Sequence, residues 1–283
     1  MGLKMNKTLA LKWISCIYTF ILTLIFFGLF LLAGVGFGAL NNRGIIRNLD
    51  ESKYYNKVYE VLYDRASRDV DATGFPRSVL NEVITLERVY FTGKSYHDAI
   101  MNSEDASLKT DKLREILDRN LRQYLKAKGV DDPEKLDMNL DQLVDTIEKD
   151  YKEAIHLPLL SSLMDYRIKY LKVIVYILPI LIFIGAFLCY LLLRIYRNRY
   201  IHRGVRYITY AMLSGSVLIS MMAGYLMLAK PYNIIAQPKY YQSFLNGYLN
   251  WSIAIFLYIG GLGSVLSLIL MSMVSYLKNR MKK

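Results

Sequence analysis

The stretch WISCIYTFILTLIFFGLFLLAGVGFGAL, from Trp13 to Leu40, contains no Asp, Glu, Lys, Arg or His. About 20 apolar residues are enough for a helix to cross a bilayer, so this stretch predicts a first membrane span even with tilt. A cleaved signal peptide is the alternative, since small residues such as Gly36 and Ala39 stand near its end. The apolar part of a signal peptide is only about 7–15 residues long, which favours an uncleaved anchor. We therefore interpret residues 1–40 as a basic leader followed by the first transmembrane helix.

All 24 acidic residues lie between Asp50 and Asp165, and the sequence on either side is apolar, basic and free of acids. This distribution predicts that residues 41–170 form a water-facing domain. Apolar runs predict three later spans within residues 171–283, at Val173–Leu193, Tyr207–Ala229 and Trp251–Tyr276. The expected fold class is all-α: a polytopic membrane protein with four transmembrane helices and an extracytoplasmic helical bundle inserted between the first and second.

Apolar residues at helical spacing run through the acidic window, and no stretch alternates long enough for a sheet. We expect Asp50 to cap a helix that ends near Gly74, and a second helix to run from about Pro76 to Phe91. The later expected helices are Ser95–Ile100, Leu113–Leu125 and Leu140–Ile155. After Pro158 the pattern continues through Tyr166 into the second span, in which Pro179 predicts a kink. Pro238 is expected to start a short helix lying at the lipid surface.

The net charge of +12 comes from short basic segments beside the spans. The positive-inside rule places those segments, and therefore both termini, in the cytoplasm. This arrangement predicts a multi-pass protein of the plasma (cell) membrane and gives nucleic-acid binding no support. The residues that we expect to determine the topology are Arg194, Arg197, Arg199, Arg203, Arg206, Lys278 and Arg280.

No motif in the chain points to catalysis or to a cofactor. Gly93-Lys94-Ser95 is similar to the end of a phosphate-binding loop, but Arg88 stands where that pattern needs glycine and no strand precedes it. His97 and His156 are expected in surface or capping roles, because nothing in their spacing makes them converge on a metal. The sequence therefore predicts no metal, no cofactor and no enzyme.

Small residues recur at intervals of three and four within the last two spans. This spacing typically marks close packing between helices, and it also suits an oligomer; a substrate path is the alternative. The spans contain no ionisable Asp, Glu, Lys, Arg or His, which argues against a pump or an ion-coupled transporter. The residues concerned are Ser216, Ser220 and Gly224, and Gly260, Gly263, Ser264 and Ser267.

The leading functional interpretation is a non-enzymatic membrane protein of bacterial composition. Its outer helical domain would bind a ligand or a partner, such as another membrane or envelope protein, and the chain would serve as a sensor, scaffold or accessory subunit among membrane lipids. The alternative is a channel or permease subunit for an uncharged or lipidic solute. A membrane-embedded enzyme comes third, since no acid–base pair stands in a recognisable motif.

Overall fold

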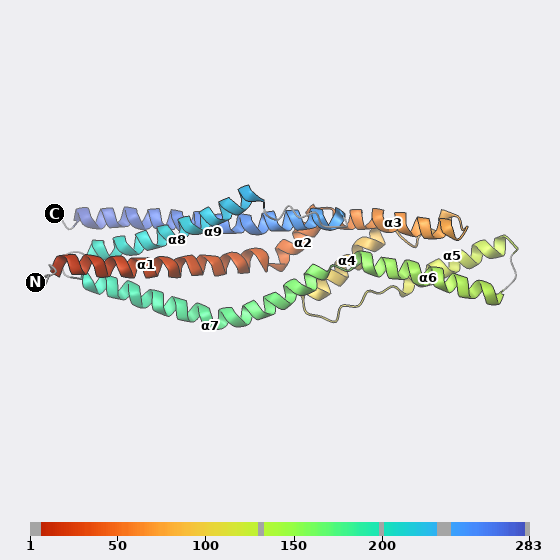
Figure 1. The fold of residues 1–283 in the computed structure, drawn as a ribbon, viewed down its shortest axis with the longest axis horizontal. Helices are drawn as coiled ribbons and strands as arrows, with labels where there is room; N and C mark the ends of the chain where they lie inside the picture. Colours follow the sequence, from red (N-terminus) through yellow and green to blue (C-terminus); the bar gives the residue numbers. More distant parts are fainter. Residues whose placement is uncertain (1–6, 130–132, 198–200, 231–238, 281–283) are drawn as a thin grey trace, which may run out of the picture. The chain divides into compact units, whose positions relative to one another are not determined.

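The computed structural model describes residues 7–129, 133–197, 201–230 and 239–280, and all regular elements within these ranges are helices (Figure 1). The chain forms two compact units. Unit 1 comprises Met1–Gly44, Arg167–Ile234 and Asn246–Lys283, and unit 2 comprises Ile45–Tyr166 and Ile235–Leu245. The helices α2 (Asn42–Glu51), α7 (Pro158–Ile195) and α9 (Lys239–Arg280) contribute residues to both units.

Four helices are long and apolar enough to cross a membrane, and they contain the four predicted spans. They are α1 (Lys7–Gly34) with its π-helical continuation η1 (Val35–Ala39), α7, α8 (Ile201–Ala229) and α9. Large apolar side chains cover their outward faces: Phe183 is 74% exposed, Leu228 87% and Leu262 65%. Such surfaces are unfavourable in water but would meet acyl chains in a bilayer.

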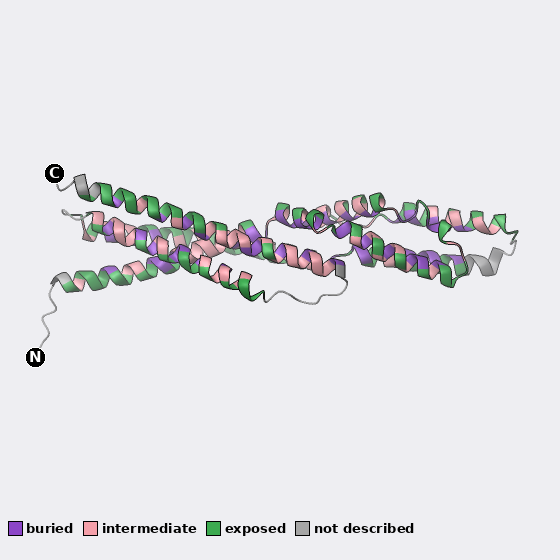
Figure 2. Cartoon of the chain, turned by 90° about the horizontal axis from the view of Figure 1, so that it is seen from above, coloured by how far each residue is buried: buried purple, intermediate pink, exposed green. Residues whose placement is uncertain are grey.

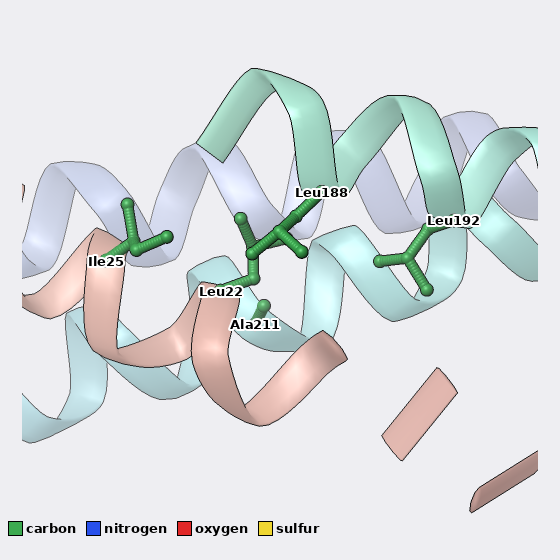
Figure 3. Close-up of a cluster of buried hydrophobic side chains, with 5 residues drawn as sticks. All are labelled: Leu22, Ile25, Leu188, Leu192 and Ala211. Atoms are coloured by element: carbon green, nitrogen blue, oxygen red, sulfur yellow. The ribbon is translucent and has the colours of Figure 1, made fainter. Parts of the chain in front are cut away.

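One hydrophobic core cluster of unit 1 lies where α1, α7 and α8 meet. Leu22 and Ile25 of α1 converge on Leu188 and Leu192 of α7, with Ala211 of α8 beside them (Figure 3). The small side chain of Ala211 allows α8 to approach closely. Close approach continues at Gly215 of the same helix, where an added Cβ would lie 3.0 Å from a backbone nitrogen of α1.

Unit 2 is built mainly from four helices, α3 (Tyr54–Ala72), α4 (Leu86–Met101), α5 (Asp111–Ala127) and α6 (Pro133–Ile155), with a short 3₁₀ turn η2 at Arg77–Leu80. The predicted stripe on α6, from Leu140 to Ile155, is buried along its length, as are Leu113, Leu117 and Leu121 of α5. Figure 2 shows buried residues along one side of these helices. The helical periodicity of this part of the sequence is therefore confirmed.

Two predicted helix starts near the beginning of unit 2 are wrong. Asp50 lies inside α2 rather than capping a helix. The helical structure is interrupted at Lys53, which has a positive φ of 50°. The predicted helix from Pro76 is only the 3₁₀ turn. The α-helix begins at Leu86, because the Thr85 hydroxyl caps it by accepting from the Arg88 backbone N–H at 3.2 Å.

The predicted break before Ser95 is absent, and α4 runs unbroken through Gly93 to Met101. Gly93 serves close packing within unit 2, since an added Cβ would lie 2.8 Å from the Tyr55 ring. Gly93, which stands between two of the expected helices, therefore lies in a buried helix contact.

The two long helices give opposite outcomes for the sequence prediction. The expected continuous helix after Pro158 is confirmed, since α7 passes through Pro179 to Ile195. The expected separate surface helix is wrong: α9 is unbroken from Lys239 to Arg280, and Phe244 and Tyr248 on its early turns are buried. Pro238 itself lies outside the described residues.

Candidate functional site

The small residues of α8 and α9 meet in a tight contact, here called the small-residue seam. A Cβ on Gly260 would lie 2.1 Å from Ser220 Oγ and 2.9 Å from the Ser216 carbonyl oxygen. A Cβ on Gly263 would lie 2.9 Å from Ser216 Cβ. The hydroxyls of Ser216 and Ser264 are 3.0 Å apart. The backbones therefore come together at these positions because the side chains are small.

The two remaining predicted seam residues, Ser267 and Gly224, differ in their contacts. Ser267 is buried and donates to the Gly263 carbonyl oxygen at 2.8 Å. Gly224 stands apart, because an added Cβ there would meet no described atom within 4 Å. The spacing of four residues therefore includes one position, Gly224, that is not in the contact.

Several of the predicted topology residues gather at one end of unit 1. The start of α1 and the ends of α7 and α9 lie at that end (Figure 1). His202, in the first turn of α8, interacts electrostatically with Arg203, Arg206 and Lys278. Arg194 and Arg197 are exposed at the end of α7. Arg199 and the side chain of Arg280 lie outside the described residues.

Unit 2 contains a groove of about 690 Å³ that sequence reasoning did not predict. Its apolar lining comes from three segments: Ala72 and Phe75 at and just after the end of α3, Leu125 of α5, and Leu140 and Leu143 of α6. The volume falls in the range of ligand pockets, which are typically apolar with a few polar groups. The polar lining residues are Asp69, Thr73, Asn139, Gln142 and Thr146.

The groove could have been anticipated only in part. Leu140 and Leu143 stand out in the sequence as a helical stripe, and the structure buries both, at 2% and 6% exposure. Nothing in the sequence indicates that Phe75 packs edge-to-face against Tyr124 of α5, with ring centroids 5.7 Å apart. That contact brings the loop after α3 to the side of α5 and α6.

His97 is fully buried in unit 2, which corrects the expectation of a surface or capping role. Its Nε2 lies 3.0 Å from the Ile155 carbonyl oxygen, which can only accept, so Nε2 carries the proton. In the neutral ring Nδ1 is then an acceptor, and the Tyr55 hydroxyl donates to it at 3.0 Å. Burial lowers the pKa of His97 to about 4, with a smaller contribution from nearby His156.

Aromatic rings pack around His97 and its partner Tyr55. Tyr54 makes edge-to-face contacts with Tyr55, Tyr240 and Phe244, at centroid distances of 5.5, 5.5 and 6.0 Å. The Tyr54 hydroxyl is buried and has no hydrogen-bond partner within the described ranges. Burial also raises the pKa of Tyr54 well above its usual value. The cluster is a closed, tightly packed core with a neutral histidine at its centre.

A second polar cluster joins α5 and α6. Glu148 accepts hydrogen bonds from Lys152 Nζ at 2.5 Å, Thr110 Oγ1 at 2.8 Å and Arg114 Nη1 at 2.9 Å. These hydrogen bonds lower the pKa of Glu148 to about 2, and the bond from Lys152 contributes most. The cluster pins the start of α5 to α6.

Metal-ligating side chains do not gather in the described part of the chain. Within it, no group of three or more His, Cys, Asp or Glu side chains could hold a metal ion. His156 is exposed and pairs with Tyr96, whose hydroxyl lies 2.9 Å from Nδ1.

Taken with the seam and the apolar surfaces, the fold defines an all-helical protein with four helices able to cross a membrane, as expected of a multi-pass membrane protein. No family model, no curated protein and no solved structure matches the chain.

Proposed function

We propose that the protein is a non-catalytic, multi-pass protein of the plasma membrane whose unit 2 binds a ligand or a partner in the groove. The observation that carries the proposal is the groove itself, whose lining combines apolar residues with polar ones that include one carboxylate, Asp69. Such a lining suits an occupant that presents an apolar group together with a hydrogen-bond donor or a positive charge.

Sidedness forms part of this proposal. The basic residues at one end of unit 1 favour a cytoplasmic location for that end. Residues 41–170 would then be extracytoplasmic, and both termini would be cytoplasmic. On this arrangement the occupant is a molecule of the cell envelope or of the medium.

The unbroken α7 supports a role in passing on the bound state. Its residues Pro158–Tyr166 belong to unit 2 and its residues Arg167–Ile195 to unit 1. A helix absorbs little movement except at a break, and the only proline inside α7 is Pro179. We therefore propose that the protein is a sensor or accessory subunit rather than a passive anchor.

The small-residue seam is the reason for ranking a channel or permease second. The hydroxyls that would line a polar path donate to carbonyls of their own helices: Ser216 to Leu213 at 2.8 Å, and Ser264 to Gly260 at 2.9 Å. These bonds satisfy the hydroxyls without a solute.

Photocrosslinking in intact cells tests the binding role. A photoreactive residue at exposed Gln142, on the groove rim, is expected to give an adduct of discrete mass. The matched control is Glu153, which is exposed on the same helix but does not line the groove. Adducts at neither position, or the same adducts at both, would contradict the proposal.

The coupling of the groove to the end of α7 is tested with the occupant that photocrosslinking identifies. In a chain with Cys16 and Cys189 replaced by serine, the labelling rate of Arg197→Cys is expected to change when the occupant is added. Inserting two glycines after Lys169 should abolish that change while occupant binding persists. An unchanged response in the insertion variant would show that α7 is only an anchor.

A further inference from the structure

A cavity of about 410 Å³ opens in unit 1 where α1 ends. Its lining carries two positive charges, Arg43 of α2 and Arg167 of α7, and contains no acidic residue. The other lining residues are Gly36, Leu40, Asn41, Asn42, Tyr170 and Leu171. The cavity is thus electropositive and has both polar and apolar walls.

The π-helical turn η1 shapes one wall of the cavity. A π turn leaves carbonyl groups without their usual partners in the helix. The Tyr170 hydroxyl donates to the Leu32 carbonyl oxygen of α1, just before the turn, and the Asn41 amide donates to the Phe37 carbonyl oxygen within it at 3.2 Å. A Cβ on Gly36 would lie 3.4 Å from the Tyr170 hydroxyl oxygen, so the backbone of η1 lies next to Tyr170 at this wall.

The start of α2 adds to the positive potential. Asn41 Oδ1 accepts from the Arg43 backbone N–H at 3.0 Å and thereby caps this ten-residue helix. The N-terminus of a helix carries partial positive charge. Two arginines and the start of α2 therefore border the same small volume.

The cavity lies at the level where the membrane-crossing surface ends. The apolar stretch of α1 closes at Ala39, and on α7 the last charged residue before the apolar run is Lys172. Leu171 is 49% exposed and Val175 65%, so an apolar face begins at the cavity mouth. Arginine and tyrosine at this level are typical of the lipid headgroup region.

We propose that this cavity binds the phosphate of an anionic phospholipid headgroup. Arg43 and Arg167 pair with the phosphate oxygens, for which the planar guanidinium group is well suited. The acyl chains follow the exposed apolar face of α7 from Leu171 onwards. The site holds a lipid beside α1 and α7 whether or not unit 2 has an occupant.

The test uses the full-length protein in detergent, with lipid binding followed by native mass spectrometry. Phosphatidylglycerol is expected to bind about tenfold or more tightly than phosphatidylcholine, because the choline cation of phosphatidylcholine would lie beside the two arginines of the cavity and oppose binding of its phosphate. Arg43→Gln and Arg167→Gln should each reduce this preference, and the double variant should abolish it. Thermal unfolding in phosphatidylcholine confirms that the variants fold.

Two matched controls separate a site from general surface charge. Arg47→Gln lies one turn further along α2, where Arg47 is paired with Glu51 at 2.7 Å, and Lys169→Gln lies on an exposed part of α7. Both should keep the full preference. Equal losses in the controls and the cavity variants, or equal binding of the two lipids, would overturn the proposal.

A further arm distinguishes a lipid from free phosphate. Millimolar inorganic phosphate should raise the melting temperature in phosphatidylcholine nanodiscs far less than phosphatidylglycerol does. If phosphate protects equally, and loses its effect in the double variant, the cavity takes a soluble anion and the lipid assignment fails.

Discussion

The imidazole of His97 lies 3.0 Å from the hydroxyl of Tyr55, a residue 42 positions earlier in the chain. The bond joins α4 to α3 inside the core of unit 2. Because the same ring donates to the Ile155 carbonyl oxygen of α6, one neutral histidine ties three helices together.

The first prediction concerns pH. The folded pKa of His97, about 4, lies below its ordinary value of 6.5, so the unfolded chain binds a proton more readily. The contribution of His97 to stability is therefore complete above pH 6.5 and is lost as the pH falls towards 4. The free energy of unfolding should decrease over this window by on the order of 3 kcal/mol. Hydrogen exchange of α4 amides in the full-length protein, followed between pH 6.5 and 4, measures this decrease.

His97→Gln is the control for this pH effect. The variant removes the titrating group, so it should be less stable at neutral pH but show a flatter dependence between pH 6.5 and 4. Glu148 is present in both proteins and therefore does not change that comparison. Equal slopes in the two proteins would show that protonation of His97 does not govern acid stability.

The second prediction concerns the small-residue seam. Gly260→Ala should lower stability in detergent by about 1–3 kcal/mol, because the new methyl group would overlap Ser220 Oγ and the Ser216 backbone. Gly261→Ala, one position further on, meets no described atom within 4 Å and should be neutral or slightly stabilising. Gly224→Ala should behave like Gly261→Ala. Similar melting temperatures for Gly260→Ala and Gly261→Ala would be inconsistent with a tight seam.

The third prediction concerns Glu148. Glu148→Gln removes the charge that Lys152, Arg114 and Thr110 surround, and it should cost about 1–2 kcal/mol at neutral pH. The pKa of Glu148 is lowered from 4.5 to about 2, so its contribution is present above pH 4.5 and is lost as the pH falls towards 2. Chemical unfolding at pH 7 and pH 3 should show a smaller difference between the two proteins at pH 3. Glu153→Gln, in an exposed pair with Lys149 at 3.8 Å, should have little effect.

The fourth prediction concerns sidedness. With Cys16 and Cys189 replaced by serine, a membrane-impermeant maleimide should label Glu104→Cys in intact cells. Arg197→Cys should react only after permeabilisation. Both positions are exposed, so accessibility within the fold does not decide the outcome. The reverse pattern would invert the proposed topology.

The sequence predicted the long elements well because their signals are strong and uninterrupted. The apolar runs around Leu22 and Leu188 mark spans, and the stripe from Leu140 to Ile155 marks α6. The continuity of α7 was also predictable, because Tyr166 to Lys172 contains no glycine or proline.

The missed features depend on tertiary contacts. Lys53 separates α2 from α3 with a positive φ. Lysine rarely adopts this conformation, so the residue type does not predict it. Gly93 stays helical because Tyr55 packs against it, and α9 continues where Phe244 is buried against Tyr54. The groove and the cavity likewise form only when segments far apart in the sequence meet.

The π-helical turn at Val35–Ala39 has a consequence for changes in chain length. A π turn accommodates one residue more than an α turn, so it commonly behaves as an insertion absorbed without breaking the helix. Removing a single residue there, such as the 67% exposed Phe37, would restore regular α spacing. The packing of Leu22 and Ile25 lies before the turn and would keep its register. The segment just after the turn would rotate about the helix axis, carrying Arg43 away from Arg167, so a one-residue deletion would disrupt the cavity while leaving the contacts of Leu22 and Ile25 in place.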